Sequence, residues 1–191
     1  MQNDSKSHLL QILKKNSVFH GDFALSSGGR SPYYIDCRLT TLNPEGASLV
    51  GELLYDLIHT EAGRRHVRID AVGGLTLGAD PVALAVGLAS FRRSPGGFLQ
   101  VFTVRKTPKA HGQTKLIEGN FKEGDRVVVV DDVVTKGDST LKAIEAVRAA
   151  GGTVEFAVVL VDREEGGRQN IESRGTPVFP LFTKSDLLGA A

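Results

Sequence analysis

Apolar residues recur along the chain at two spacings, which predict alternating helices and strands. Leu9, Leu10 and Leu13 lie at helical spacing within residues 4–15 and predict a first helix. Asn43-Pro44 is a helix-start signal, and the apolar pattern that follows it predicts a helix of about 17 residues. Two more helices are expected over residues 79–90 and 139–150.

Short apolar, β-branched runs lie between these helices. Because they are apolar throughout rather than alternating, both faces of the resulting sheet are expected to be covered. The predicted fold class is therefore α/β, with a central, mostly parallel sheet flanked by helices. The predicted strands are 67–72, 99–104, 127–130, 154–161 and 178–181.

The N-terminal part of the chain does not follow this rhythm. Residues 18–43 alternate short apolar runs with turns, such as Ser26-Ser27-Gly28-Gly29, and predict strands and turns. We expect a single domain over residues 1–191, in which residues 1–43 form a small N-terminal hood and residues 44–191 form the core.

Composition narrows the class of protein. The chain has 191 residues, of which 41% are hydrophobic and 24% charged, as in ordinary globular domains. Its net charge of +1 argues against a nucleic-acid partner. The apolar runs are shorter than the roughly 18–20 residues needed to span a bilayer, so no membrane partner is expected. Cys37 is the single cysteine, which excludes an internal disulfide and favours the cytoplasm.

The stretch from Arg126 to Thr140, RVVVVDDVVTKGDST, carries the strongest chemical signal. A strand leads through two acids into a turn around Gly137 and then into a helix. Ligands of open α/β sheets bind beyond the carboxyl ends of strands. Successive N–H groups in such a turn, together with the helix start, form a cradle for a phosphate. The alternative is a strand–turn–helix in which Asp138 or Ser139 is a plain N-cap.

Asp131 and Asp132 suit a different group. Carboxylates repel phosphate but accept hydrogen bonds from the vicinal hydroxyls of a sugar. A phosphate cradle beside two acids therefore indicates a ribose 5-phosphate. The Walker and Rossmann glycine patterns are absent from the chain.

This segment resembles the ribose-phosphate motif of type I phosphoribosyltransferases, which transfer ribose from 5-phosphoribosyl 1-diphosphate (PRPP) to a nitrogen base. The resemblance implies the type I phosphoribosyltransferase fold and Mg²⁺ as cofactor, held mainly by substrate and water, with Asp131 or Asp132 as its candidate protein ligands. It also implies that one continuous segment binds PRPP. The implied residues are Asp131, Asp132, Val133, Val134, Thr135, Lys136, Gly137, Asp138 and Ser139.

A second motif lies in residues 105–119, RKTPKAHGQTKLIEG, which predict a loop rich in cations. Such a loop could stabilise a diphosphate leaving group and exclude water, or it could be a plain solvated loop. Its Arg-Lys-x-x-x-Lys-x-His-Gly pattern resembles the catalytic loop of orotate phosphoribosyltransferases. That family shares the loop across a homodimer. The resemblance implies that Arg105, Lys109 and His111 act on the neighbouring subunit's PRPP and that Lys106 acts on its own.

Two further motifs extend the resemblance over about residues 18–182. Residues 23–36 resemble the family's base-recognition segment, and residues 73–81 resemble its glycine-rich diphosphate loop. Arg163 matches an arginine that pairs with the base, although a surface ion pair with Glu164 or Glu165 is the alternative. Many relatives carry lysine where this chain has Ser26, and some carry it at Gly78. The implied orotate-binding residues are Ser27, Gly28, Tyr33, Tyr34, Thr135 and Arg163.

These motifs lead to one expected function. The chain is expected to transfer ribose 5-phosphate from PRPP to orotate, giving orotidine 5′-phosphate and diphosphate in pyrimidine biosynthesis. Lys109, His111, Asp131 and Asp132 are the expected catalytic residues. A phosphoribosyltransferase for a purine or another base, or a non-catalytic regulator of the same fold, remains as an alternative.

Overall fold

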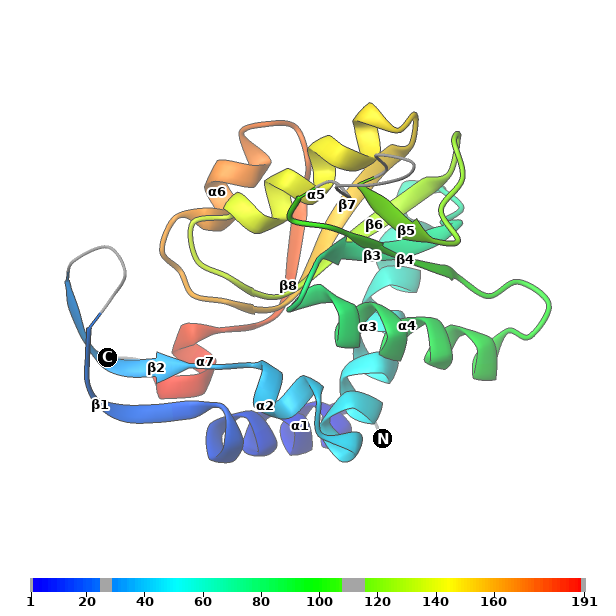
Figure 1. Ribbon diagram of the computed structural model, residues 1–191. Helices are drawn as coiled ribbons and strands as arrows, with labels where there is room; N and C mark the ends of the chain where they lie inside the picture. The colour runs from blue at the N-terminus through cyan, green and yellow to red at the C-terminus, as the bar shows by residue number, and fades with distance from the viewer. Residues whose placement is uncertain (1, 25–28, 108–115, 190–191) are drawn as a thin grey trace.

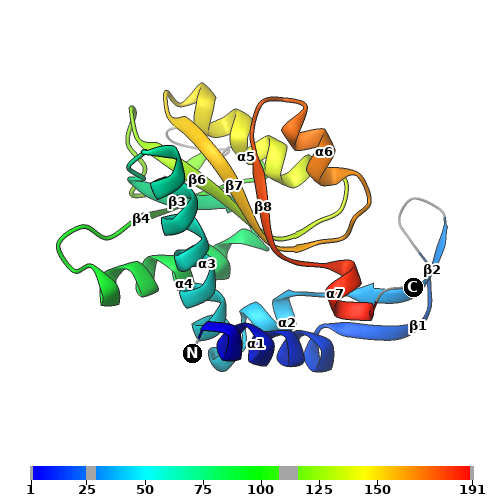
Figure 2. The same ribbon diagram turned by 180° about the vertical axis from the view of Figure 1, so that it is seen from behind.

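The computed structural model describes residues 2–24, 29–107 and 116–189. The chain begins with helix α1 (Gln2–Asn16), strands β1 (Val18–Ala24) and β2 (Arg30–Ile35), and the short helix α2 (Arg38–Thr41). β1 and β2 pair in antiparallel fashion as a separate two-stranded sheet. In both ribbon views this hairpin extends beneath the loops that follow strands β6 and β7 of the main sheet (Figures 1 and 2).

The main sheet has six strands in the order β5-β4-β3-β6-β7-β8. All neighbouring pairs are parallel except β4 and β5, so the predicted α/β class with a mostly parallel sheet is confirmed. The strands are β3 (Ala71–Leu75), β4 (Gln100–Val104), β5 (Ile117–Gly119), β6 (Arg126–Val134), β7 (Thr153–Asp162) and β8 (Val178–Thr183).

Helices cover both faces of this sheet (Figure 1). Val128 and Val130 of β6 pack toward α3 and α4, whereas Val127 and Val129 pack toward α5. This alternation explains why the run is apolar at every position. Among the described helices, none combines the length and the apolar character that crossing a bilayer demands. The core helices are α3 (Pro44–Arg65), α4 (Ala79–Arg93), α5 (Asp138–Ala149), α6 (Gly167–Glu172) and α7 (Lys184–Leu188).

Several predicted boundaries were wrong. The strand predicted over 67–72 is β3 at Ala71–Leu75. Its start is delayed because the N–H of Val67 bonds to the carbonyl of Ala62 and so belongs to the end of α3. Its end lies beyond Gly73, because the missing side chain there makes room for the neighbouring strand: a Cβ would lie 2.3 Å from the carbonyl oxygen of Phe102. Residues 117–119, predicted as loop, form β5 against β4.

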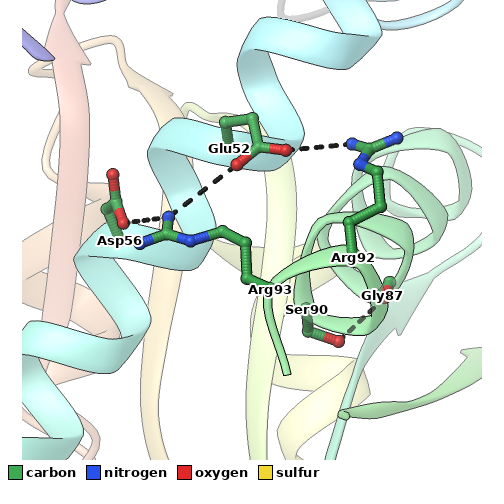
Figure 3. A network of polar contacts seen from close by, with 6 residues as sticks. All are labelled: Glu52, Asp56, Gly87, Ser90, Arg92 and Arg93. Atoms are coloured by element: carbon green, nitrogen blue, oxygen red, sulfur yellow. Dashed lines mark hydrogen bonds and ion pairs between the residues drawn. The ribbon is translucent and has the colours of Figure 1, made fainter. Parts of the chain in front are cut away.

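Helices α3 and α4 pack closely under the sheet. A Cβ on Gly51 of α3 would lie 2.5 Å from the Ala85 carbonyl oxygen of α4, so only glycine permits this approach. At the C-terminal end of α4, Arg92 reaches Glu52 of α3 at 3.0 Å, and Arg93 pairs with Asp56 (Figure 3). Such exposed ion pairs contribute little stability, so the apolar contact is the main force between these helices.

The two glycines of α3 give a matched test of this packing. Gly51→Ala should destabilise the protein by about 1–3 kcal/mol, because the new methyl group must displace the backbone of α4. Gly63→Ala, in the same helix and with no atom within 4 Å of the new Cβ, should stabilise by up to about 1 kcal/mol. Urea unfolding of both variants measures the difference. Equal stability of the two variants would contradict the close helix contact.

Candidate active site

A cavity of about 360 Å³ opens at the carboxyl ends of β6 and β7. These strands are parallel neighbours near the middle of the sheet, so the loops that follow them converge at one edge. Both the predicted phosphate segment and Arg163 reach this cavity. The lining residues are Asp131, Val133, Val134, Thr135, Lys136, Gly137, Asp138, Ser139, Thr140, Arg163 and Glu165.

The turn between β6 and α5 has the backbone shape expected of an anion cradle. Gly137 has a φ of +87°, a conformation that disfavours residues with a side chain, and α5 starts immediately after it. Neither Asp138 nor Ser139 is the N-cap, since that position is Gly137 and the helix start has no side-chain cap. No side chain caps the first N–H groups of α5. They are therefore available at the N-terminal end of the helix, where an anion is favoured.

The loop after β7 and the start of α6 support this turn from behind. Gly167 lies against it so closely that a Cβ would meet the Thr135 carbonyl oxygen at 2.5 Å. The Asn170 amide donates to the carbonyl oxygen of Lys136 at 2.9 Å, and the Lys136 amine donates to the carbonyl oxygen of Glu165 at 3.1 Å. The phosphate turn and the Arg163 loop are thus fixed to each other. The sequence analysis did not predict the supporting role of Gly167. The Gly166-Gly167 pair was the signal that could have indicated a close backbone contact there.

Asp131 lines the cavity but is only 4% exposed. Its carboxyl accepts hydrogen bonds from the Thr140 hydroxyl at 3.0 Å and from the N–H of Asp132 at 3.1 Å. Burial, together with the nearby charge of Asp132, raises the pKa of Asp131 to about 8. This pKa favours a proton on Asp131 near neutral pH.

Asp132 points to the other face of β6, as successive residues of a strand do, and it does not line the cavity. Burial raises its pKa, while the positive charge of Arg38 opposes that rise. Its carboxyl lies directly beside Gly78: a Cβ on Gly78 would lie 2.3 Å from its Oδ1. The lysine that some relatives carry at this position would not fit without moving Asp132.

Arg163 directs its guanidinium across the cavity rather than into solvent. Its side chain is 13% exposed, and its Nη2 lies 2.8 Å from Glu165 Oε1. Its Nε is buried and has no hydrogen-bond partner among the described residues. The ion pair that the sequence offered as an alternative is therefore present, yet it lies inside the cavity and leaves one donor unused.

The backbone around Arg163 is held by contacts that sequence reasoning missed. The Arg163 N–H bonds to the carbonyl oxygen of Val134, which extends the β6–β7 pairing by one residue. Asp162, 5% exposed, accepts from the N–H of Glu164 at 2.8 Å, and Glu164 in turn accepts from the hydroxyl of Ser185 at 2.7 Å. The acid-rich sequence after β7 was the available signal.

The two tyrosines of β2 separate because neighbouring strand residues face opposite ways. Tyr33 meets Arg163, whose guanidinium lies 5.6 Å from the ring centroid. Tyr34, 41% exposed, packs instead with the rings of Phe19 and Phe23. The structure thus brings Tyr33 to the Arg163 side of the cavity and leaves Tyr34 within the aromatic cluster of the hood.

Some predicted site residues stand apart from this cavity or cannot be placed. Arg105 follows β4, and its Nη1 lies 3.7 Å from Glu118 Oε1. Lys106 is exposed beside it, and neither residue lines the cavity. Ser27 and Gly28, together with Ser26, lie outside the described residues, as do Lys109 and His111.

The described residues contain no group of three or more His, Cys, Asp or Glu side chains arranged to hold a metal ion. A carboxyl of Asp131 does face the cavity. That donor set suits Mg²⁺, which commonly binds one or two carboxylates and completes its shell with substrate oxygens and water.

No protein-family model matches the chain. Comparison with individual proteins, in contrast, agrees with the geometry of the cavity. The chain is 45% identical over 186 residues to an orotate phosphoribosyltransferase of Aquifex aeolicus, covering 96% of this chain and 97% of that one.

Two crystal structures of Mycobacterium tuberculosis H37Rv orotate phosphoribosyltransferase are also similar. The complex with Fe(III) dicitrate has a TM-score of 0.83 and 39% identity, over 96% of this chain and 99% of that one. The complex with PRPP has a TM-score of 0.76 and 32% identity, over 96% and 92%. The expected type I phosphoribosyltransferase fold is thereby confirmed, and the chain belongs to the orotate phosphoribosyltransferase family.

Proposed function

We propose that this chain transfers ribose 5-phosphate from PRPP to orotate, giving orotidine 5′-phosphate and diphosphate in pyrimidine biosynthesis. The observation that carries the proposal is the single cavity in which the β6–α5 turn, Asp131 and Arg163 meet. The turn can bind a phosphate, Asp131 can accept hydrogen bonds from sugar hydroxyls, and Arg163 can bind a base that carries a carboxylate. All three line the same cavity. The mycobacterial relative that binds PRPP with the same fold supports the same reading.

The 5-phosphate occupies the turn formed by Thr135, Lys136, Gly137, Asp138 and Ser139. Main-chain N–H groups at the start of α5 bind its oxygens, and the hydroxyls of Thr135 and Ser139 add donors. Val133 and Val134 line the approach from β6. The contacts through Gly167 and Asn170 keep this turn in place before substrate arrives, so little ordering entropy is lost on binding.

The acid pair holds the ribose. In this proposal Asp131 accepts from its hydroxyls in the cavity, and Asp132, beside Gly78 on the other face of β6, adds its negative charge near the diphosphate end of the ribose. Asp131 would be the protein ligand of a Mg²⁺ ion held mainly by substrate oxygens and water, and that ion would supply positive charge to neutralise the diphosphate. As the bond from C1′ to the leaving oxygen lengthens, positive charge develops on the ribose, and the nearby carboxylates stabilise it.

The base end of the cavity fits orotate. The unused Nε of Arg163 and the Nη2 now held by Glu165 provide two donors to a carboxylate or carbonyl. Tyr33 supplies a flat wall next to that guanidinium. Thr135 and the hood residues Ser27 and Gly28 complete the orotate site in this proposal, while Tyr34 supports the hood beside it through its contacts with Phe19 and Phe23.

The electron pair of orotate N1 forms the new bond to C1′, and diphosphate departs with the electron pair of the broken C–O bond. The turn at Leu77 and Gly78, at the end of the glycine-rich segment 73–78, offers main-chain N–H groups to the departing diphosphate. The basic loop adds positive charge through Arg105, Lys106, Lys109 and His111. The imidazole of His111 can also share a proton with a phosphate oxygen. Positioning and electrostatics supply most of the catalysis.

The basic loop acts across a homodimer in this proposal. An apolar groove of about 340 Å³ between α2, α3 and α4 supports a second copy of the chain as its occupant. Leu42, Leu84 and Leu88 line it and are 66%, 55% and 50% exposed. Leu77, 60% exposed, extends apolar surface to the glycine-rich loop. Burying these side chains against another subunit would remove from water the four most exposed leucines of the described residues.

Residues 1–43 form the hood and residues 44–191 the core of a single domain in this proposal. The hood brings Tyr33 to the base. The cytoplasm is the proposed location, where the buried thiol of Cys37 stays reduced.

An ultraviolet assay tests the reaction directly. We expect orotate to be consumed only when both PRPP and Mg²⁺ are present, with orotidine 5′-phosphate as product. Adenine, hypoxanthine, xanthine and uracil serve as competing bases under the same conditions. Good turnover of a purine without turnover of orotate would overturn the proposal.

Mixing two inactive variants tests loop sharing. Lys109→Ala should lower kcat by about 10²–10³-fold, because a cation on the leaving group is lost. Asp131→Ala/Asp132→Ala should be inactive because the ribose loses its acceptors. After subunit exchange, half of the dimers are mixed and each has one intact site, so activity should return to about a quarter of wild type. Proven exchange without recovery would show a loop that acts within its own subunit.

The buried acid at the site should cost stability. With its pKa raised from 3.8 to about 8, Asp131 keeps its proton in the folded state over a range in which the unfolded chain has lost it. Its contribution to stability therefore falls as pH rises between about 4 and 8. Asp131→Asn should match the wild type near pH 4 and exceed it by at least about 1 kcal/mol at pH 9, while losing activity.

Thermal unfolding at pH 4, 7 and 9, without substrate or Mg²⁺, measures this difference. Asp138→Asn, at an exposed position of the same turn, is the control and should show no such trend. A pH-independent difference for Asp131→Asn would contradict the raised pKa.

A further inference from the structure

Asp80 makes contacts that the site described so far does not use. It lies in the first turn of α4, immediately after the glycine-rich segment 73–78. The Thr76 hydroxyl donates to Asp80 Oδ2 at 2.6 Å, and the Thr103 hydroxyl of β4 donates to Asp80 Oδ1. One carboxylate thus joins the glycine-rich segment to the neighbouring strand.

These contacts fix the segment from two directions. The N–H of Thr76 bonds to the carbonyl oxygen of Val104 at 2.8 Å, while its side chain is held by Asp80. β3 and β4 are parallel and in register up to Leu75 and Val104, so this pairing extends the sheet by one residue beyond β3. Thr76 therefore cannot turn away from β4 without losing both bonds.

The chemistry of Thr76, Thr103 and Asp80 fixes the direction of both hydrogen bonds. A carboxylate only accepts, so each threonine hydroxyl must aim its proton at Asp80. Hydrogen bonds to a charged group are roughly twice as strong as those between neutral groups. Two such donors also reduce the repulsion that this carboxylate would exert on an anion bound nearby.

We propose that Asp80 is a positioning residue that, by holding Thr76, keeps the main chain of Leu77 and Gly78 in the conformation that binds the diphosphate of PRPP. This inference rests on the proposed function. Asp80 does not touch the ligand. It acts through Thr76, and Thr103 anchors it to the strand from which the basic loop departs. Pre-organised N–H groups bind an anion without the entropic cost of ordering the loop.

Product binding separates this role from a general structural one, because orotidine 5′-phosphate has the ribose phosphate and the base but no diphosphate. Asp80→Ala should raise both the KM for PRPP and the Kd of Mg²⁺-diphosphate by about 10-fold or more, as expected when a charge-assisted contact is lost. The Kd of orotidine 5′-phosphate should stay within about twofold of wild type. Calorimetry and steady-state kinetics on the full chain provide these values.

Two variants serve as controls. Asp186→Ala removes another first-turn aspartate that accepts from a threonine hydroxyl, and it should change none of these constants because that carboxyl bonds to Thr183 at the start of its own helix and not to the glycine-rich segment. Asp80→Asn keeps one acceptor oxygen and should recover part of the diphosphate affinity. If Asp80→Ala fails to fold, Thr103→Val removes only the hydrogen bond from β4 to Asp80. This variant should show the same selective loss of diphosphate affinity, but a smaller one.

Equal weakening of diphosphate and orotidine 5′-phosphate, or no change in either, would overturn the role of Asp80 and leave the proposed function intact. A wild-type protein that binds neither PRPP nor orotidine 5′-phosphate would overturn the proposed function and, with it, this inference.

Discussion

The parallel pairing of β6 and β7 is the constraint on which the rest of the molecule depends. Their strands are the longest of the sheet and bury side chains on both faces. Parallel strands end at the same edge, so the turn after β6 and the loop after β7 emerge side by side. The N–H of Arg163 continues the ladder onto Val134. Core packing thereby sets the distance between the phosphate turn and the arginine.

The sequence predicted the parts of this arrangement that depend on local chemistry. The apolar run of β6, the glycine turn and the start of α5 were all visible, since each follows from residue type and spacing. The existence and class of most elements followed in the same way, whereas their ends did not. The predicted start of β3 was four residues too early. The N–H of Val67 bonds back to the end of α3, and no local pattern shows this bond.

Other parts of the site arise from contacts between distant segments, which no local pattern encodes. Gly167 packs against Thr135 from the start of α6, and the Asn170 amide of the same helix donates to the carbonyl oxygen of Lys136. The separation of Tyr33 from Tyr34 depends on which face of β2 meets the core. The family resemblance named these tyrosines together, while the strand geometry gives them different surroundings.

Gly78 and Asp132 have a consequence for how this family can vary. The Cβ of any other residue at position 78 would enter the space of the Asp132 carboxyl. Because that carboxyl is the end of a flexible side chain, a larger residue at position 78 can be admitted by a change of the Asp132 rotamer. The two positions are therefore coupled: the side chain at position 78 determines the direction in which the Asp132 carboxyl points.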